Sequence, residues 1–140
     1  MKTVIQGGTL VTSQGSYTAD ILIHQGLIAE IGPALAKKAD RVVDAAGCLV
    51  FPGFIDGHTH FDLHNGLVRT SDDFETGTLA AVMGGTTTIV DFATQNKGET
   101  LDEALTNWRQ KAWQKASCDY GFHMAITDWN EQTALDLHKM

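Results

Sequence analysis

The sequence predicts an α/β protein in which short strands come first and strand–helix units follow. Two observations carry this prediction. Residues 1–51 hold only short apolar, β-branched runs separated by turn residues, whereas strand-like and helix-like patterns alternate from residue 52 to residue 140. Strands that alternate with helices are typical of parallel sheets built from βα units. We therefore expect two parts, residues 1–51 and residues 52–140.

The first part is expected to form a small sheet. Glycine-containing turns are predicted at Gly7-Gly8 and at Gln25-Gly26, and the second of these joins two strands into a hairpin. An isolated hairpin is marginal in water, so this sheet needs a further layer of structure. The expected strands cover residues 3–5, 9–11, 20–24, 27–31, 41–44 and 48–51.

The second part is expected to contain three βα units. Asp72, followed by Glu75 three residues later, predicts an N-terminal cap for the first helix. Three units do not close a barrel, because eight of them need roughly 250 residues. The expected strands cover residues 54–58, 86–92 and 119–127. The expected helices cover residues 72–83 and 101–112 and begin again at residue 131; the second is striped by Leu101, Leu105, Trp108 and Ala112.

Composition and charge narrow the possible partners and the compartment. The net charge of −7, without a cluster of lysine or arginine, argues against nucleic acid and against an anionic membrane surface. No apolar run approaches the ~18 residues of a membrane span. The N-terminus lacks a basic stretch followed by an apolar segment, so no signal peptide is expected. Together with two reduced cysteines, Cys48 and Cys118, this predicts a cytoplasmic protein.

The strongest chemical signal is a pair of histidines two residues apart. His58 and His60 close a strand-like run, and alternate side chains of a strand point to the same face. Zinc binds imidazole nitrogen and usually takes at least three protein ligands, so the pair is half a site. The pair also ends the first strand of the βα series, where the active sites of βα barrels lie. We therefore predict that both histidines bind metal, against the alternative that they are ordinary core or surface residues.

Four linked motifs make the chain similar to a known family. It resembles the amidohydrolase superfamily, and within it the N-terminal portion of the dihydropyrimidinase and D-hydantoinase branch. The resemblance implies an α/β fold: the first strands and helices of a (β/α)8 TIM-like barrel, preceded by part of a small β-sandwich. The motifs are Phe51-Pro-Gly-Phe-Ile-Asp-Gly-His-Thr-His60, Ser71-Asp-Asp-Phe-Glu-Thr-Gly-Thr78, Gly84-Gly-Thr-Thr-Thr-Ile-Val-Asp-Phe92 and Asp119-Tyr-Gly-Phe-His123.

The resemblance also implies a reaction and its cofactors. The complete family site holds two zinc ions, of which His58 and His60 would bind the more buried one. A bridging carboxylated lysine, two further histidines and a proton-shuttling aspartate are expected beyond residue 140, so no catalytic residue is expected within this chain. A metal-bound hydroxide would open a dihydropyrimidine or hydantoin ring to an N-carbamoyl amino acid. The substrate would thus be a small cyclic amide, the full-length protein a homotetramer, and the 140-residue chain alone inactive.

Four further polar residues have predicted roles. Asp56 is expected either to orient a metal-binding histidine or to satisfy a turn. His123 is expected either to support the site from behind or to pack. His64 and Asn65 lie in the loop after the pair, which lines the substrate entrance in related hydantoinases. Related enzymes tend to carry Pro-Phe in this loop, so the different residues here leave the substrate open. His64 is alternatively a third ligand or a plain loop histidine.

Other functions share parts of the pattern. Allantoinase and dihydroorotase are cyclic amidohydrolases that share the histidine pair. Dihydropyrimidinase-like scaffolds keep the fold but have lost metal ligands, whereas this chain retains both ligands that it could show. A truncated product of an interrupted reading frame, without independent function, is the remaining alternative for the 140 residues alone.

Overall fold

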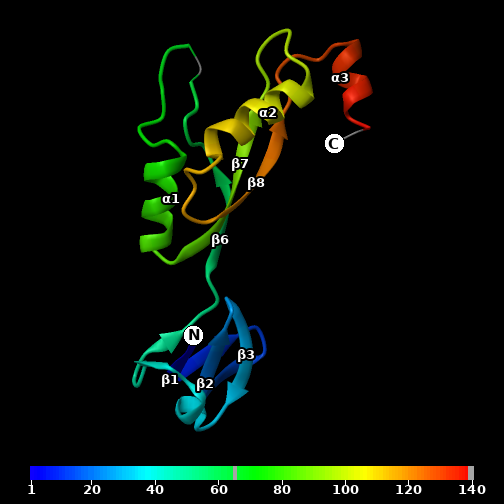
Figure 1. Ribbon diagram of the computed structural model, residues 1–140. Helices are drawn as coiled ribbons and strands as arrows, with labels where there is room; N and C mark the ends of the chain where they lie inside the picture. The colour runs from blue at the N-terminus through cyan, green and yellow to red at the C-terminus, as the bar shows by residue number, and fades with distance from the viewer. Residues whose placement is uncertain (65, 139–140) are drawn as a thin grey trace. The chain divides into compact units, whose positions relative to one another are not determined.

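The computed structural model describes residues 1–64 and 66–138 and divides the chain into two units (Figure 1). The units are Met1–Pro52 and Gly53–Met140, and each is described by itself. Among the described residues, no helix is both long enough and apolar enough to cross a membrane.

The first unit is a five-stranded sheet with a short 3-10 helix. The strand order is β3-β2-β1-β4, and β5 also pairs with β1. β1, β2 and β3 are antiparallel neighbours, whereas β4 and β5 run parallel to β1. The elements are β1 (Lys2–Thr12), β2 (Gly15–His24), β3 (Leu27–Gly32), η1 (Leu35–Lys38), β4 (Arg41–Asp44) and β5 (Leu49–Val50).

The predicted turn at Gly7-Gly8 is wrong, because the strand continues through it as a β-bulge. The β1–β2 register shifts between Ile5 and Gly8, and Gly7 has φ 72°, which glycine adopts without the usual steric cost. The carboxylate of Asp20 holds the bulge, since it is buried and its Oδ1 accepts the Gly7 N–H at 2.9 Å. Its Oδ2 accepts the N–H of Leu35 at 2.9 Å, which joins the 3-10 helix to the sheet.

The predicted hairpin turn at Gln25-Gly26 is confirmed. The two residues have φ 54° and φ 78°, and β2 and β3 pair antiparallel on either side of them. Two consecutive positive φ angles match the right-handed twist of the flanking strands, which explains the short connection.

The second unit contains the three predicted βα units. The strands form a parallel sheet in the order β6-β7-β8 (Figure 1), which confirms the α/β class. The elements are β6 (Phe54–Thr59), α1 (Phe74–Met83), β7 (Thr86–Thr94), α2 (Leu101–Ala112), β8 (Asp119–Ala125) and α3 (Glu131–Asp136).

β7 is the central strand, and its two faces differ. Ile89, Asp91 and Ala93 are buried, whereas Val90 and Phe92 between them are only half-buried. Ile89 and Ala93 share one apolar core with Phe74 of α1 and Trp108 of α2, so both helices cover the same face of the sheet. Because side chains alternate along a strand, Phe92 lies on the opposite face.

The cap of α1 differs from the prediction. The helix begins at Phe74, and its N-cap is Asp73 rather than Asp72. One oxygen of Asp73 accepts the backbone N–H groups of Glu75 and Thr76, and the Thr76 hydroxyl completes the capping box in place of the predicted Glu75. These hydrogen bonds, that from the Thr76 backbone first, lower the pKa of Asp73 from its ordinary value.

Candidate metal centre

The histidine pair converges as its spacing predicts. His58 lies in β6 and His60 directly after it, and their Nε2 atoms are 3.2 Å apart. Tetrahedral zinc with Zn–N distances of about 2.0–2.1 Å separates two nitrogen ligands by roughly 3.3–3.4 Å. The ring planes are inclined by 82°, and both residues are exposed. This donor pair therefore suits a metal that approaches from the open side of the sheet, while the metal role itself stays a prediction.

An aromatic floor lies beneath the two imidazoles. The ring centroid of Phe92 is 4.6 Å from that of His58, 5.0 Å from that of His60 and 4.9 Å from that of His123. Contacts at these distances restrict the tilt of each ring. The floor also places a carbon surface, rather than water, on one side of the paired nitrogens.

His123 reaches this floor from the outer strand β8. Its Nε2 is 3.1 Å from the carbonyl oxygen of Gly57 and donates to it, because a carbonyl can only accept. The side chain thus spans β7 and contacts the backbone immediately before His58. This position is compatible with support of the site from behind and with packing, and the choice between them stays a prediction.

Asp56 lies on β6 two residues before His58. Its Oδ1 accepts the backbone N–H of His58 at 3.1 Å, and the residue is exposed. The carboxylate therefore contacts the main chain of a predicted ligand rather than its ring. Its predicted role as an orienting group stays open.

The loop after the pair folds back on itself. The backbone of Leu63 bonds to the Thr70 hydroxyl at 3.0 Å, and the Thr70 N–H donates to the Leu63 carbonyl at 3.0 Å. His64 forms an antiparallel bridge with Arg69, and its Nδ1 accepts the Gly66 N–H at 3.4 Å. His64 is exposed and lies five residues after the end of β6. The predicted substrate contact Asn65 lies outside the described residues.

The base of this loop is fixed to α2. Asp62 has φ 48°, a left-handed conformation that aspartate tolerates better than most residues. Lys111 donates to the Asp62 carbonyl at 2.8 Å, and its ammonium lies 3.7 Å from the centroid of the Trp108 ring. Burial lowers the pKa of Lys111, and the Asp62 carboxylate opposes this shift.

Sequence reasoning missed the most highly connected side chain near the pair, Asp91. It is fully buried in β7, and its carboxylate accepts four hydrogen bonds. The signal in the sequence is a single acidic residue within an apolar, β-branched strand. Its partners come from β6, from the residue after His60, from the next residue of β7 and from α2, and only the three-dimensional arrangement brings these segments together.

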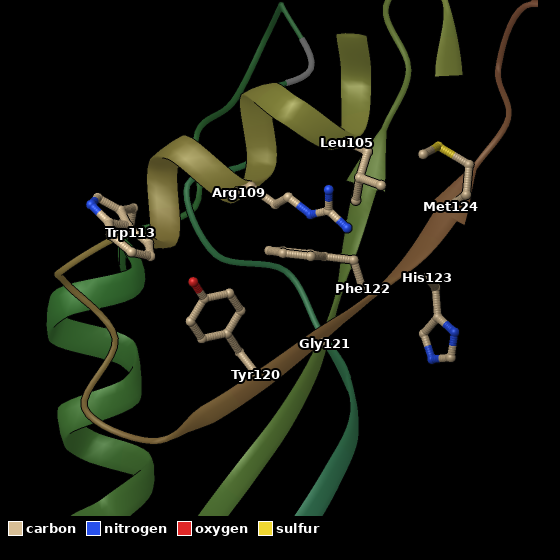
Figure 2. Close-up of a pocket in the computed structure, with 8 residues that line it drawn as sticks. All are labelled: Leu105, Arg109, Trp113, Tyr120, Gly121, Phe122, His123 and Met124. Atoms are coloured by element: carbon tan, nitrogen blue, oxygen red, sulfur yellow. The ribbon is translucent and has the colours of Figure 1, made fainter. Parts of the chain in front are cut away.

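A hollow of about 680 Å³ lies beside β8 and α2 (Figure 2). Tyr120 and Phe122 project towards Arg109 and the helix, whereas His123 points away on the other side of the strand. The hollow therefore opens mainly on the helix-covered face, and the histidine pair lies on the opposite face.

Comparison with known proteins identifies the class of protein that carries this site. Residues 41–129, more than half of the chain, match the model of the Amidohydrolase family. The chain belongs to this family.

Its relatives lie in the branch that the motifs indicate. The chain is 49% identical to a D-hydantoinase of Geobacillus stearothermophilus over 140 residues, which cover 100% of this chain and 30% of that protein. It is 42% identical to a dihydropyrimidinase of Dictyostelium discoideum, covering 96% of this chain and 27% of the relative. The crystal structure of a dihydropyrimidinase from Brevibacillus agri matches with a TM-score of 0.91 at 46% identity, over 98% of this chain and 30% of that one.

These matches confirm the resemblance and the fold class. The chain spans about 30% of the length of the D-hydantoinase relatives that it matches.

Proposed function

We propose that this chain supplies the first two metal ligands of a zinc-dependent hydrolase that opens a cyclic amide. The ligands are His58 and His60, and the observation that carries the proposal is the 3.2 Å separation of their Nε2 atoms at the carboxyl end of β6. The substrate class, a dihydropyrimidine or hydantoin ring, rests on the relatives named D-hydantoinase and dihydropyrimidinase. The product would be an N-carbamoyl amino acid.

The residues of this chain would bind one metal ion and orient the two imidazole rings that hold it. The two imidazoles offer Nε2 lone pairs to one ion, and Phe92 limits the movement of both rings from below. When bound, zinc would lower the pKa of a coordinated water and polarise the ring carbonyl. The loop that carries His64 follows the pair directly, so it is suited to contact the substrate ring.

Other parts of the complete site would come from polypeptide outside these 140 residues. The carboxylated lysine, the further histidines and the proton-shuttling aspartate have no counterparts assigned in this chain, which spans 30% of the D-hydantoinase relative. We accordingly propose that the 140 residues alone do not turn over substrate. As separate proposals, the complete protein is a homotetramer, which the family resemblance implies, and is located in the cytoplasm.

The direct test is zinc retention by the purified 140-residue chain. Zinc per chain would be measured by elemental analysis after dialysis against a low zinc concentration. We expect the wild type to retain more zinc than a His58→Ala/His60→Ala double variant. His24→Ala, which removes a histidine of the first unit, is the matched control and should retain as much zinc as the wild type.

Hydrolysis of hydantoin and of dihydrouracil would be assayed on the same samples. We expect no measurable turnover by the chain alone, and metal-dependent turnover would contradict the proposed inactivity. Equal zinc contents in the wild type and the double variant would contradict the assignment of the metal ligands.

A further inference from the structure

Asp91 is a buried carboxylate that connects three parts of the second unit. It is 0% exposed, and its four hydrogen-bond donors come from β6 and the segment after it, from β7 itself, and from α2. Burying a carboxylate is costly unless hydrogen bonds compensate for the lost water. A side chain placed here only to fill the core would more economically be apolar.

One carboxylate oxygen acts on both neighbours of His60. Oδ2 accepts the hydroxyl of Thr59 at 2.8 Å and the backbone N–H of Phe61 at 2.9 Å. Thr59 is also the β6 residue that pairs with Asp91 in the sheet. The side chain of the residue before the histidine and the main chain of the residue after it are therefore held by one carboxylate oxygen, so that His60 lies between two anchored neighbours.

The other oxygen fixes the carboxylate itself. Oδ1 accepts the backbone N–H of Phe92 at 2.8 Å and the indole Nε1–H of Trp108 at 3.1 Å. Both donors belong to buried or half-buried residues of β7 and α2. The group that holds the histidine segment is thus itself anchored to the helix layer.

The next residue acts on the same histidines from the other face. Asp91 lies on the face covered by the helices, where it accepts from Trp108, whereas Phe92 lies on the open side and contacts the rings of His58 and His60. Two adjacent residues of one strand thereby act on the site: Asp91 holds the neighbours of His60, and Phe92 contacts the rings of both histidines.

We infer that Asp91 is a positioning residue for the predicted metal ligand His60, which acts by holding the Thr59 side chain before it and the Phe61 backbone after it. The inference deepens the proposed function, since it gives a role in metal binding to a residue that contacts no metal. Groups that orient metal ligands from behind typically change metal affinity 10–100-fold when removed.

Asp91→Asn is the informative change because it keeps the shape. An amide presents only one oxygen, so it cannot accept from both pairs of donors. The NH2 group should take the place of Oδ2, because there the Thr59 hydroxyl can turn and accept from it, whereas both partners of Oδ1 are N–H donors that cannot accept. The Phe61 N–H would then lose its partner. A second variant, Thr59→Val, removes one bond to Oδ2 and leaves the carboxylate in place, so the test does not depend on one substitution folding.

The experiment uses the isotope-labelled 140-residue chain in two measurements. First, nuclear Overhauser contacts between the two imidazole rings report their convergence without metal. Second, titration with zinc chloride, followed through the ring nitrogens, gives a Kd. The matched control is Asp20→Asn, which makes the same change in a buried carboxylate of the first unit and should leave both readouts unchanged.

We expect Asp91→Asn to weaken the ring contacts and to raise the zinc Kd about tenfold, and Thr59→Val to raise it roughly two- to fivefold. Unchanged ring contacts and an unchanged Kd in both variants would overturn the inference. If the wild type shows the ring contacts but binds no zinc at the pair, the proposed metal site fails, while the ring contacts of the variants still decide the role of Asp91.

Discussion

Replacing Gly77 with alanine should destabilise the second unit, although the same replacement normally stabilises a helix. Gly77 is buried within α1, where alanine is favoured over glycine by about 1 kcal/mol. The obstacle is the ring of Phe61, the residue that follows His60. The two contributions oppose each other, so their magnitudes decide the sign.

The overlap is larger than the helix preference. A Cβ added at Gly77 would lie 2.6 Å from Cδ1 and 2.7 Å from Cζ of Phe61, whereas ordinary contacts begin at 3.4 Å. The nearest ring atom, Cε1, is closer still, so the ring would have to retreat by more than about 0.8 Å, and overpacking of this kind costs about 1–3 kcal/mol. Against the gain of about 1 kcal/mol, we expect a net loss of up to about 2 kcal/mol in the free energy of unfolding.

Urea denaturation followed by tryptophan fluorescence measures this loss selectively. The three tryptophans, at positions 108, 113 and 129, all belong to the second unit, so their signal reports its unfolding. Gly84→Ala, at the C-cap of the same helix, is the matched control, because Gly84 has φ −87° and an added Cβ would meet nothing closer than 3.4 Å. A urea midpoint that rises for Gly77→Ala as it does for the control would refute the reasoning.

Three further predictions concern buried and capping charges. Asp20→Asn should cost the first unit about 1–3 kcal/mol, because an amide accepts only one of the two backbone N–H bonds that the carboxylate holds; unchanged amide-exchange protection in β1 and β2 would contradict this. The pKa of Asp73 is lowered from 3.8 in the folded state, mainly by the hydrogen bond from the Thr76 backbone. The contribution of this carboxylate to folding stability is therefore complete above 3.8 and is lost as the pH falls through the lower pKa of the folded state. Asp73→Asn should therefore flatten the acid limb of stability against pH, and superimposable acid limbs would count against this cause. Burial lowers the pKa of Lys111 from 10.5 despite the opposing Asp62, so the folded state binds fewer protons than the unfolded chain just below that value. Folding stability should rise with pH in this window, and Lys111→Met should remove the rise. Parallel curves of urea midpoint against pH for the wild type and the variant would contradict this role of Lys111.

Local periodicity was sufficient to predict most elements of this fold. The stripe that includes Leu101 and Trp108 identified α2, and both side chains are buried. Two errors arose where neighbouring residues carry the same local signal. A Gly-Gly pair is typical both of turns and of bulges, and pairing of β1 with β2 on both sides of Gly7 decides for the bulge. Likewise, two adjacent aspartates can each cap a helix, and Asp73 does so because the first turn begins at Phe74.

The histidine pair of the candidate site was predictable from the sequence, whereas the residue inferred to position it was not. A spacing of two on a strand is a local property, so the convergence of His58 and His60 followed from the sequence. The role inferred for Asp91 depends on the register of β6 against β7, which joins residues 32 positions apart in the bond from Thr59. No local pattern carries that register, and the residue therefore escaped prediction.

Successive side chains of β7 lie on opposite faces of the sheet, so the face that each residue occupies depends on its exact position in the strand. Asp91 lies on the helix-covered face and Phe92 on the face of the imidazoles, so adding or deleting a single residue within the strand would exchange the two. A ring would then enter the helix layer, and a carboxylate would take its place beneath the histidines. Changes in length that preserve the pair are consequently confined to the connections, such as residues 62–73, which follow the pair and precede α1. Insertions and deletions in the loops leave the two faces of β7 unchanged, whereas within the strand only changes of two residues at a time would do so.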